Sequence, residues 1–132
     1  MSPMPVQQLL VVDDQPTMRR VLCALLKDIG FERVEAAADG VAALQRLRQG
    51  RFDLVITDVL MPNMDGLELL AAIRGDAALQ HLPVLVVTAE ARHDEIERSM
   101  QVGATACIVK PFTRTEFEER VRDVLERRAA AA

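Results

Sequence analysis

Acidic, hydroxyl and ammonium side chains follow four of the five short apolar segments of this 132-residue sequence. Asp13 and Asp14 follow the first segment, Asp58 the third, Thr88 the fourth and Lys110 the fifth. Three carboxylates brought together repel one another unless cations balance them. Lys110 supplies one positive charge, and a divalent ion would supply two more. These residue types therefore predict a metal-dependent site, provided that the segments end at a common place.

The chemistry predicted for such a site is phosphoryl transfer to a carboxylate. Oxygen-only ligands favour Mg²⁺ over zinc or copper, and Mg²⁺ usually keeps positions for water and phosphate oxygens. A carboxylate beside this ion can attack phosphorus and form an aspartyl phosphate, and Asp58 is the candidate nucleophile. Thr88 and Lys110 would stabilise the oxygens of the transferred group. Phosphorylation replaces one negative charge by about two, and we expect that change to alter the shape of the molecule.

Each of these residues also has a purely structural explanation. An Asp pair after a strand commonly begins a turn or caps a helix, and Asp58 could begin the following turn. Thr88 could cap the next helix, and Lys110, which precedes Pro111, could be an ordinary surface lysine. Their joint occurrence at the ends of four apolar segments favours the functional interpretation.

The apolar pattern alternates between short runs and helical spacing along the whole chain. Strands are predicted at residues 9–12, 34–37, 54–57, 84–87 and 106–109. Apolar residues recur at helical spacing within residues 18–29, 41–47, 67–71, 96–102 and 117–125. This order predicts an α/β fold of the (βα)5 type, a doubly wound five-stranded parallel sheet with helices on both faces. Ligands bind such sheets beyond the carboxyl ends of the strands, which is where the polar residues stand.

Two of the predicted helices begin with a capping signal. Asp39 is expected to cap the helix that carries Val41, Leu44 and Leu47 on its apolar side. Thr113, followed three residues later by Glu116, has the pattern of a capping box at the start of the last helix.

Length and composition predict one domain over residues 1–132, with a core at about 7–128 and a disordered tail at 129–132.

The net charge of −4 and the absence of Tyr and Trp argue against nucleic acid as a partner. Arg19 and Arg20 form a tight basic pair that a solvated helix face explains. No apolar run is long enough for a signal peptide or a membrane span. Cys23 and Cys107 lie in apolar runs, so we expect buried, reduced thiols in a cytoplasmic protein that does not bind membranes.

With these motifs in place, the sequence resembles the receiver domains of two-component response regulators, the CheY-like chemotaxis regulators in particular. The resemblance runs from about residue 9 to residue 128. It is carried by VVDD at 11–14, DVLMPNMDG at 58–66, VTAEA at 87–91 and KPF at 110–112. It implies the flavodoxin-like, CheY-like strand order 2-1-3-4-5.

The resemblance also implies a role for each residue of the site. Asp58 would be the phosphoacceptor, and Asp13, Asp14 and Asp58 would bind Mg²⁺ together with the backbone carbonyl of Leu60. Thr88 and Lys110 would contact the phosphoryl group. Domains of this kind catalyse their own phosphorylation and dephosphorylation, so the chain is not expected to be an enzyme in the ordinary sense.

A second group of residues is implied to act in the switch or in partner binding, namely Glu90, Cys107 and Pro111. The Lys110–Pro111 bond is expected to be cis. Cys107 stands where CheY-like proteins usually carry a Tyr or Phe that reports activation. A cysteine is too small to report activation by the same packing, and we interpret Cys107 as a residue that fills space rather than a redox centre.

The resemblance implies partners at both ends of the signal. The phosphoryl donor would be the phosphohistidine of a sensor histidine kinase, or a phosphotransfer protein. A downstream protein would dock on the face formed by the helix from His93, the fifth strand and the last helix, and a flagellar switch protein or a phosphatase are candidates. Because no output domain follows residue 128, we expect a stand-alone, monomeric receiver.

Three alternatives stay open at this point. The chain could be a phosphate sink or relay intermediate without motor binding. It could be a haloacid-dehalogenase-type phosphotransferase, although those enzymes carry an acid–x–acid motif with the nucleophile on the first strand, where this chain has an adjacent Asp pair. It could also be a pseudo-receiver that binds partners without being phosphorylated.

Overall fold

Five strands alternate with five helices in the computed structural model, which describes residues 7–89 and 93–131. The strands are β1 (Gln8–Val12), β2 (Arg33–Ala37), β3 (Leu54–Asp58), β4 (Val84–Ala89) and β5 (Ala106–Lys110). The helices are α1 (Pro16–Ile29), α2 (Gly40–Gln49), α3 (Gly66–Gly75), α4 (His93–Val102) and α5 (Arg114–Ala131). The predicted alternation is confirmed in every element.

The strands form one parallel sheet in the order β2-β1-β3-β4-β5, which confirms the predicted (βα)5 fold and strand order. β1 lies between β2 and β3, with Val12 in register with Ala37 on one side and Thr57 on the other. The chain therefore leaves β1 toward one edge of the sheet and resumes from β3 toward the other. A doubly wound sheet has its ligand crevice at this switch point, beyond the ends of β1 and β3.

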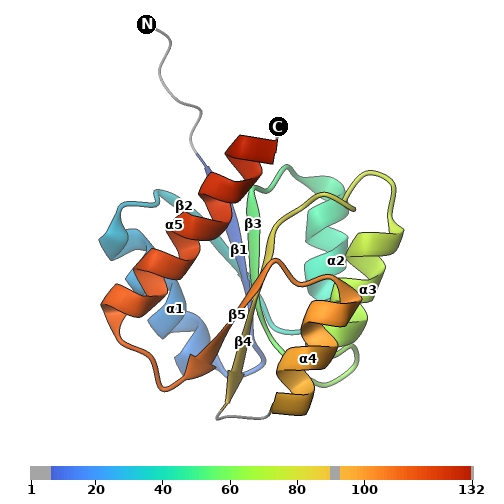
Figure 1. Cartoon of the computed structure of the whole chain (residues 1–132), viewed down its shortest axis with the longest axis horizontal. Coiled ribbons are helices and arrows are strands. Elements are labelled where there is room, and N and C mark those ends of the chain that lie inside the picture. Colours follow the sequence, from blue (N-terminus) through green and yellow to red (C-terminus); the bar gives the residue numbers. More distant parts are fainter. Residues whose placement is uncertain (1–6, 90–92, 132) are drawn as a thin grey trace, which may run out of the picture.

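Helices cover both faces of the sheet and bury a separate apolar cluster on each (Figure 1). α1 and α5 lie on one face, where Leu22, Leu26 and Phe117 are almost completely buried. α2 and α3 lie on the other face, where Leu47 and Leu70 are buried. Because the central strands β1, β3 and β4 contribute to both clusters, they are buried on both sides, as their continuous apolar runs predict.

The capping signals at the helix starts are confirmed with one correction. Asp39 caps α2 by accepting a hydrogen bond from the Ala42 amide at 2.8 Å. At the start of α5, the Thr113 hydroxyl accepts from the Glu116 amide at 3.1 Å. The expectation that Val41 packs inward is wrong, because its side chain is 43% exposed. Leu44 and Leu47 are buried as expected, and Ala43 rather than Val41 completes the buried side of α2 together with Gly40.

Other differences from the sequence-based expectations are small. β4 and β5 each continue past the predicted end, so Thr88 and Lys110 belong to the strands themselves. α5 is continuous to Ala131 and so includes most of the segment expected to be a tail. Cys23 and Cys107 are free thiols, as expected, but both are half-buried rather than buried. Within the described residues no helix is long and apolar enough to span a membrane.

Candidate functional site

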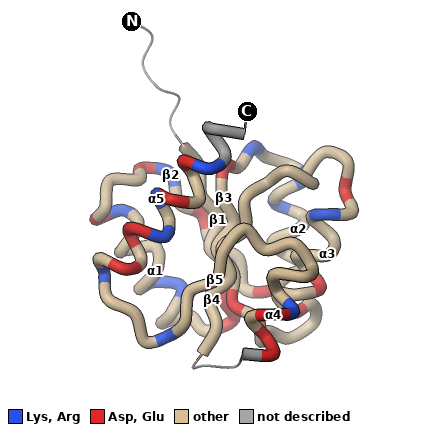
Figure 2. Tube along the Cα trace, viewed as in Figure 1, with Lys and Arg blue, Asp and Glu red and all other residues tan. Residues whose placement is uncertain are grey.

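The carboxyl ends of β1 and β3 bring three acidic side chains together. Carboxylate oxygens of Asp13, Asp14 and Asp58 all lie within 4.8 Å of one another. Figure 2 shows acidic residues gathered around the lower rim of the strands and along α4, on the side toward which the strands run. The predicted convergence of the three carboxylates is therefore confirmed.

Asp13 is the buried member of this acidic cluster, with an exposed fraction of 1%. Its Oδ1 accepts a hydrogen bond from the Gln15 amide at 2.9 Å, which turns the chain from β1 into α1. Its backbone carbonyl accepts from the Arg19 guanidinium at 2.7 Å. Arg19 is thus not simply a solvated residue, as we expected, but a half-buried clamp on the loop that carries the acids.

Burial and like charges both act on the Asp13 carboxyl. Burial is the main cause that raises its pKa, and the nearby charges of Asp58 and Asp14 raise it further. The hydrogen bond from the Gln15 amide and the charge of Lys110 lower the pKa in part. The net effect raises the pKa of Asp13, so the charged form of this carboxyl is unfavourable when no cation is bound.

Asp58, at the end of β3, is held at both carboxylate oxygens. Oδ1 accepts a hydrogen bond from the Val59 amide at 2.7 Å, and Oδ2 lies 3.4 Å from the Nζ of Lys110. The side chain of Asp58 is 17% exposed and that of Lys110 is 21% exposed, so both can be reached from solvent. An exposed edge of a fixed carboxylate beside an ammonium group suits attack on an incoming phosphoryl group.

The donor set fits a Mg²⁺ ion. Three carboxylates from two adjacent strand ends offer only oxygen ligands, and their mutual spacing allows a single ion to contact one oxygen of each. Burial is the main cause that raises the pKa of Asp13, and the charges of Asp58 and Asp14 add to it, so a bound cation would favour the charged form of this carboxyl. Bound there, Mg²⁺ would offset negative charge on the carboxylates and on phosphoryl oxygens.

Thr88, at the end of β4, is buried, and its hydroxyl is occupied by another partner than the phosphoryl group that we predicted for it. The Thr88 hydroxyl donates to Oε2 of Glu95, in the first turn of α4, at 3.0 Å. Glu95 is a residue that sequence reasoning missed. Its position near a helix start gave no sign that it would reach back to the strand, because an acid there also suits the helix dipole.

The remaining predicted residues lie around the rim. The Lys110–Pro111 bond is cis, as expected. Leu60 is 59% exposed just beyond Asp58, and its role as a carbonyl ligand stays a prediction. Glu90 lies outside the described residues.

Cys107, on β5, is half-buried against α4, where its Sγ lies 3.9 Å from the Sδ of Met100. Burial raises the pKa of this thiol, although the hydroxyl of Ser99 and the charge of Arg120 lower it in part. A raised pKa leaves the thiol protonated near neutral pH and therefore poorly nucleophilic. This environment agrees with the interpretation of Cys107 as a residue that fills space.

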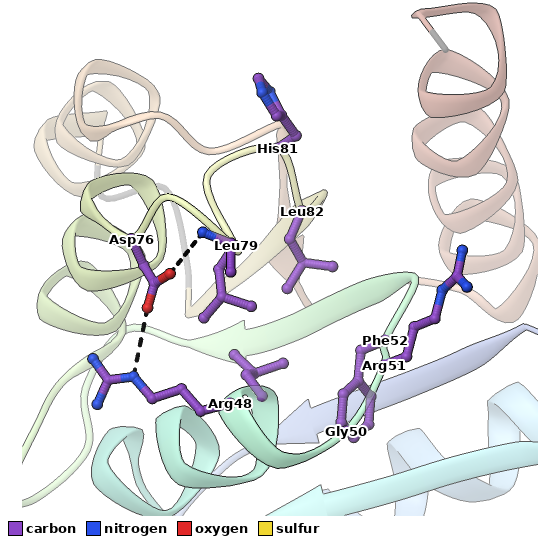
Figure 3. A pocket seen from close by; sticks show the side chains of 10 residues that line it. Arg48, Gly50, Arg51, Phe52, Asp76, Leu79, His81 and Leu82 are labelled. Atoms are coloured by element: carbon purple, nitrogen blue, oxygen red, sulfur yellow. Dashed lines mark hydrogen bonds and ion pairs between the residues drawn. The ribbon is translucent and has the colours of Figure 1, made fainter.

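A hollow of about 390 Å³ lies at the opposite end of the sheet from the acidic cluster, where the chain enters β3 and β4. Its nitrogen-containing side chains do not converge: Arg48 pairs with Asp76 at 3.5 Å, while Arg51 and His81 lie apart from each other (Figure 3). Phe52 and Leu82 form part of an apolar wall without a central polar group. This hollow offers no chemistry comparable to the acidic cluster.

A doubly wound five-stranded sheet of order 2-1-3-4-5, with an acidic cluster and a lysine beyond its strand ends, defines the flavodoxin-like class of CheY type. The family model described as "Response regulator receiver domain" matches residues 9–122. The chain belongs to this family.

Similar proteins agree with that assignment. The "Chemotaxis protein CheY" of Pseudomonas aeruginosa is 47% identical over 120 residues, which covers 91% of this chain and 97% of that protein. The "Chemotaxis protein CheY-3" of Vibrio cholerae is also 47% identical and is covered to 92%.

Solved structures give the same result. The chemotaxis response regulator CheY4 of Vibrio cholerae is similar with a TM-score of 0.83 and 35% identity, over 90% of this chain and 98% of that one. The signal receiver domain of a histidine kinase from Syntrophus aciditrophicus is similar with a TM-score of 0.83 and 32% identity, over 91% and 90% of the two chains. The receiver fold thus occurs both in chemotaxis regulators and in kinases among the relatives.

Proposed function

We propose that the chain is a phosphoryl-accepting response regulator in which Asp58 takes a phosphoryl group from a phosphohistidine, with Mg²⁺ held by Asp13, Asp14, Asp58 and the Leu60 carbonyl. The observation that carries the proposal is the grouping of three carboxylate oxygens within 4.8 Å, with Lys110 Nζ 3.4 Å from Asp58 Oδ2. Asp13 supports the proposal further, because burial and the neighbouring charges of Asp58 and Asp14 make its charged form unfavourable unless a cation is bound.

The reaction is a displacement at phosphorus. An oxygen of Asp58 forms the new O–P bond, and the P–N bond to the donor histidine breaks. The imidazole keeps the electron pair of that bond and takes up a proton. The ammonium group of Lys110 already lies beside Asp58, so it can pair with the phosphoryl oxygens once negative charge has been transferred to them.

The surface that we propose for the donor protein is next to this site. A mostly apolar hollow of about 430 Å³ adjoins Lys110 and is open to solvent. It is lined by Met18, Val21, Ala89, Lys110, Pro111 and Phe112. Val21 is an apolar residue on α1 that is 46% exposed, so this patch presents apolar surface to solvent. An apolar patch next to a reactive carboxylate suits a sensor histidine kinase or phosphotransfer protein that must bring its phosphohistidine to Asp58.

The output is proposed to be protein binding in chemotaxis signalling, on the face formed by α4, β5 and α5. Two relatives of matching length are named chemotaxis proteins, which supports this pathway. A flagellar switch protein or a phosphatase is the kind of partner that the proposal implies. Met100, 48% exposed on α4 beside Cys107, gives this face an apolar contact point.

The first test is mass spectrometry of the intact protein after incubation with acetyl phosphate and Mg²⁺. We expect one phosphate adduct on the wild type and none on Asp58→Asn. Asp94→Asn, which neutralises an exposed aspartate on α4, is the matched control and should be modified like the wild type. An adduct that persists undiminished in Asp58→Asn refutes the assignment of the acceptor.

The same measurement separates the alternatives. A pseudo-receiver would give no adduct under any condition. A haloacid-dehalogenase-type enzyme would carry its adduct on Asp13 or Asp14, so the adduct would survive in Asp58→Asn. A phosphate sink or relay intermediate would be modified at Asp58 but would fail to bind a flagellar switch protein in its phosphorylated form.

A further inference from the structure

The hydroxyl of Thr88 is engaged by a carboxylate on α4 rather than free to serve the acceptor site. Thr88 is 1% exposed, and its hydroxyl donates to Glu95 Oε2 at 3.0 Å. Glu95 is half-buried and lies in the first turn of α4, seven residues along the chain from Thr88. This bond links the end of β4, beside the acceptor site, to the start of the helix that borders the proposed output face.

A threonine hydroxyl has a single proton, so one strong acceptor takes it at the expense of another. If Thr88 is to donate to a phosphoryl oxygen on Asp58, it must first leave Glu95. A hydrogen bond to a carboxylate is about twice as strong as one between neutral groups. Glu95 therefore competes with the phosphoryl group for the same proton.

From this competition we infer that Glu95 is a positioning residue that holds the Thr88 hydroxyl away from Asp58 and so limits how tightly the site retains a phosphoryl group. The inference rests on the proposed function and concerns the regulation of the same site. Glu95 reaches the acceptor site through its hydrogen bond from Thr88, so its proposed role is positioning rather than chemistry.

The same contact gives a route from the site to α4 that does not need an aromatic residue at position 107. When Thr88 leaves, Glu95 loses one hydrogen-bond donor at a half-buried carboxylate, and this loss changes the forces on the first turn of α4. The backbone carbonyl of Glu95 accepts a bond from the hydroxyl of Ser99 at 2.7 Å. Ser99 is fully buried, and the next residue of α4, Met100, places its Sδ 3.9 Å from the Sγ of Cys107 on β5. A change at Glu95 therefore reaches β5 through α4 itself.

The decisive variant is Glu95→Gln, which keeps the shape and an acceptor oxygen but removes the charge. Its matched control is Glu97→Gln, which changes the net charge equally on the same helix but at an exposed position. We would titrate each protein with beryllium fluoride, a phosphoryl mimic, at fixed Mg²⁺. Glu95→Gln should bind about three- to tenfold more tightly than the wild type, as expected when a charge-assisted bond becomes a neutral one. Glu97→Gln should match the wild type.

Dependence on Thr88 distinguishes positioning from a general effect of charge. In a Thr88→Ala background there is no hydroxyl to compete for, so adding Glu95→Gln should leave the affinity for beryllium fluoride unchanged. A gain of the same size in that background overturns the inference, and so does equal affinity of Glu95→Gln and the wild type.

A readout without metal or mimic is the amide NMR spectrum of the metal-free protein. Glu95→Gln should shift the Ser99 amide signal part of the way toward its position in the mimic-bound wild type, and no such shift would contradict the proposed route. Failure of the wild type to bind beryllium fluoride would refute the proposed function and this inference with it. Normal binding by the wild type, without a difference in Glu95→Gln, overturns the inference alone.

Discussion

Asp13 is buried in the fold but must carry a negative charge if it is to bind a cation. A carboxylate that is 1% exposed and lies near two other carboxylates is unfavourable in its charged form. Asp13→Asn keeps an oxygen for the Gln15 amide and removes the charge. Without Mg²⁺, we expect this variant to raise the free energy of unfolding by about 1 kcal/mol in urea denaturation at pH 7.

The matched control for Asp13→Asn is Asp14→Asn, at an exposed position of the same cluster. It should change metal-free stability less, while both variants should lose most of the stabilisation that Mg²⁺ gives the wild type. The pKa of Asp13 is raised in the fold, so its charge destabilises the native state above that pKa. The advantage of Asp13→Asn should therefore shrink as the pH falls toward the usual range of aspartate. Lower metal-free stability in Asp13→Asn at pH 7 would contradict this account.

At this scale the sequence predicted the acids and the lysine but not the contacts that position them. Asp58 and Lys110 could be placed together because the ends of parallel strands meet at one rim. Glu95 could not be found in the same way, because its bond to Thr88 depends on the angle at which α4 returns to the sheet. The clamp from Arg19 on the Asp13 carbonyl was missed for the same reason.

The turn from β3 into α3 leaves the least space for a side chain among the glycine positions of the described residues. A Cβ added at Gly66 would lie 2.0 Å from the carbonyl oxygen of Asp58, so backbone atoms of the acceptor itself would have to move. Gly66→Ala should lower the free energy of unfolding by about 2–4 kcal/mol. It should also reduce phosphate uptake from acetyl phosphate, because Asp58 shifts relative to Lys110.

Gly75, at the other end of α3, provides the matched control. A Cβ there meets nothing within 4 Å. Gly75→Ala should therefore be neutral or stabilising by up to about 1 kcal/mol, since alanine is the better helix former. Thermal unfolding and the acetyl phosphate reaction would be measured on both variants. Equal losses in Gly66→Ala and Gly75→Ala would show that close packing at the Asp58 carbonyl is not the cause.

Element order and type could be predicted because buried strands and amphipathic helices have different apolar spacing. The error at Val41 shows the limit of that method. In α2 both Val41 and Ala43 fit a helical stripe, and the larger residue was assigned to the core. The structure instead buries Ala43 completely in the cluster on this face of the sheet, which depends on how α2 is rotated against its neighbours and is not contained in local spacing.

For the whole molecule, the notable feature is that two apolar clusters share one sheet. Phe117 of α5 belongs to one cluster and Leu70 of α3 to the other, and both side chains are completely buried. Between them, adjacent residues of β3 alternate: Ile56 packs into the α1/α5 cluster and Val55 into the α2/α3 cluster. Neither cluster can be lost without exposing one face of the same strands.

This arrangement predicts that damage on one face lowers stability on both. Phe117→Leu should cost about 1–2 kcal/mol and Leu70→Ala about 2–5 kcal/mol of the free energy of unfolding. In each variant, native-state hydrogen exchange of the slowest amides in β1 and β3 should accelerate by the factor that corresponds to its own loss of stability. The domain should unfold in one cooperative step, as single domains of this size usually do. The result that would contradict this prediction is faster exchange in α5 alone of Phe117→Leu, with the amides of α3 as protected as in the wild type. The two faces of the sheet would then unfold as independent units. In that case the route from Thr88 through α4 would involve only one of the two faces.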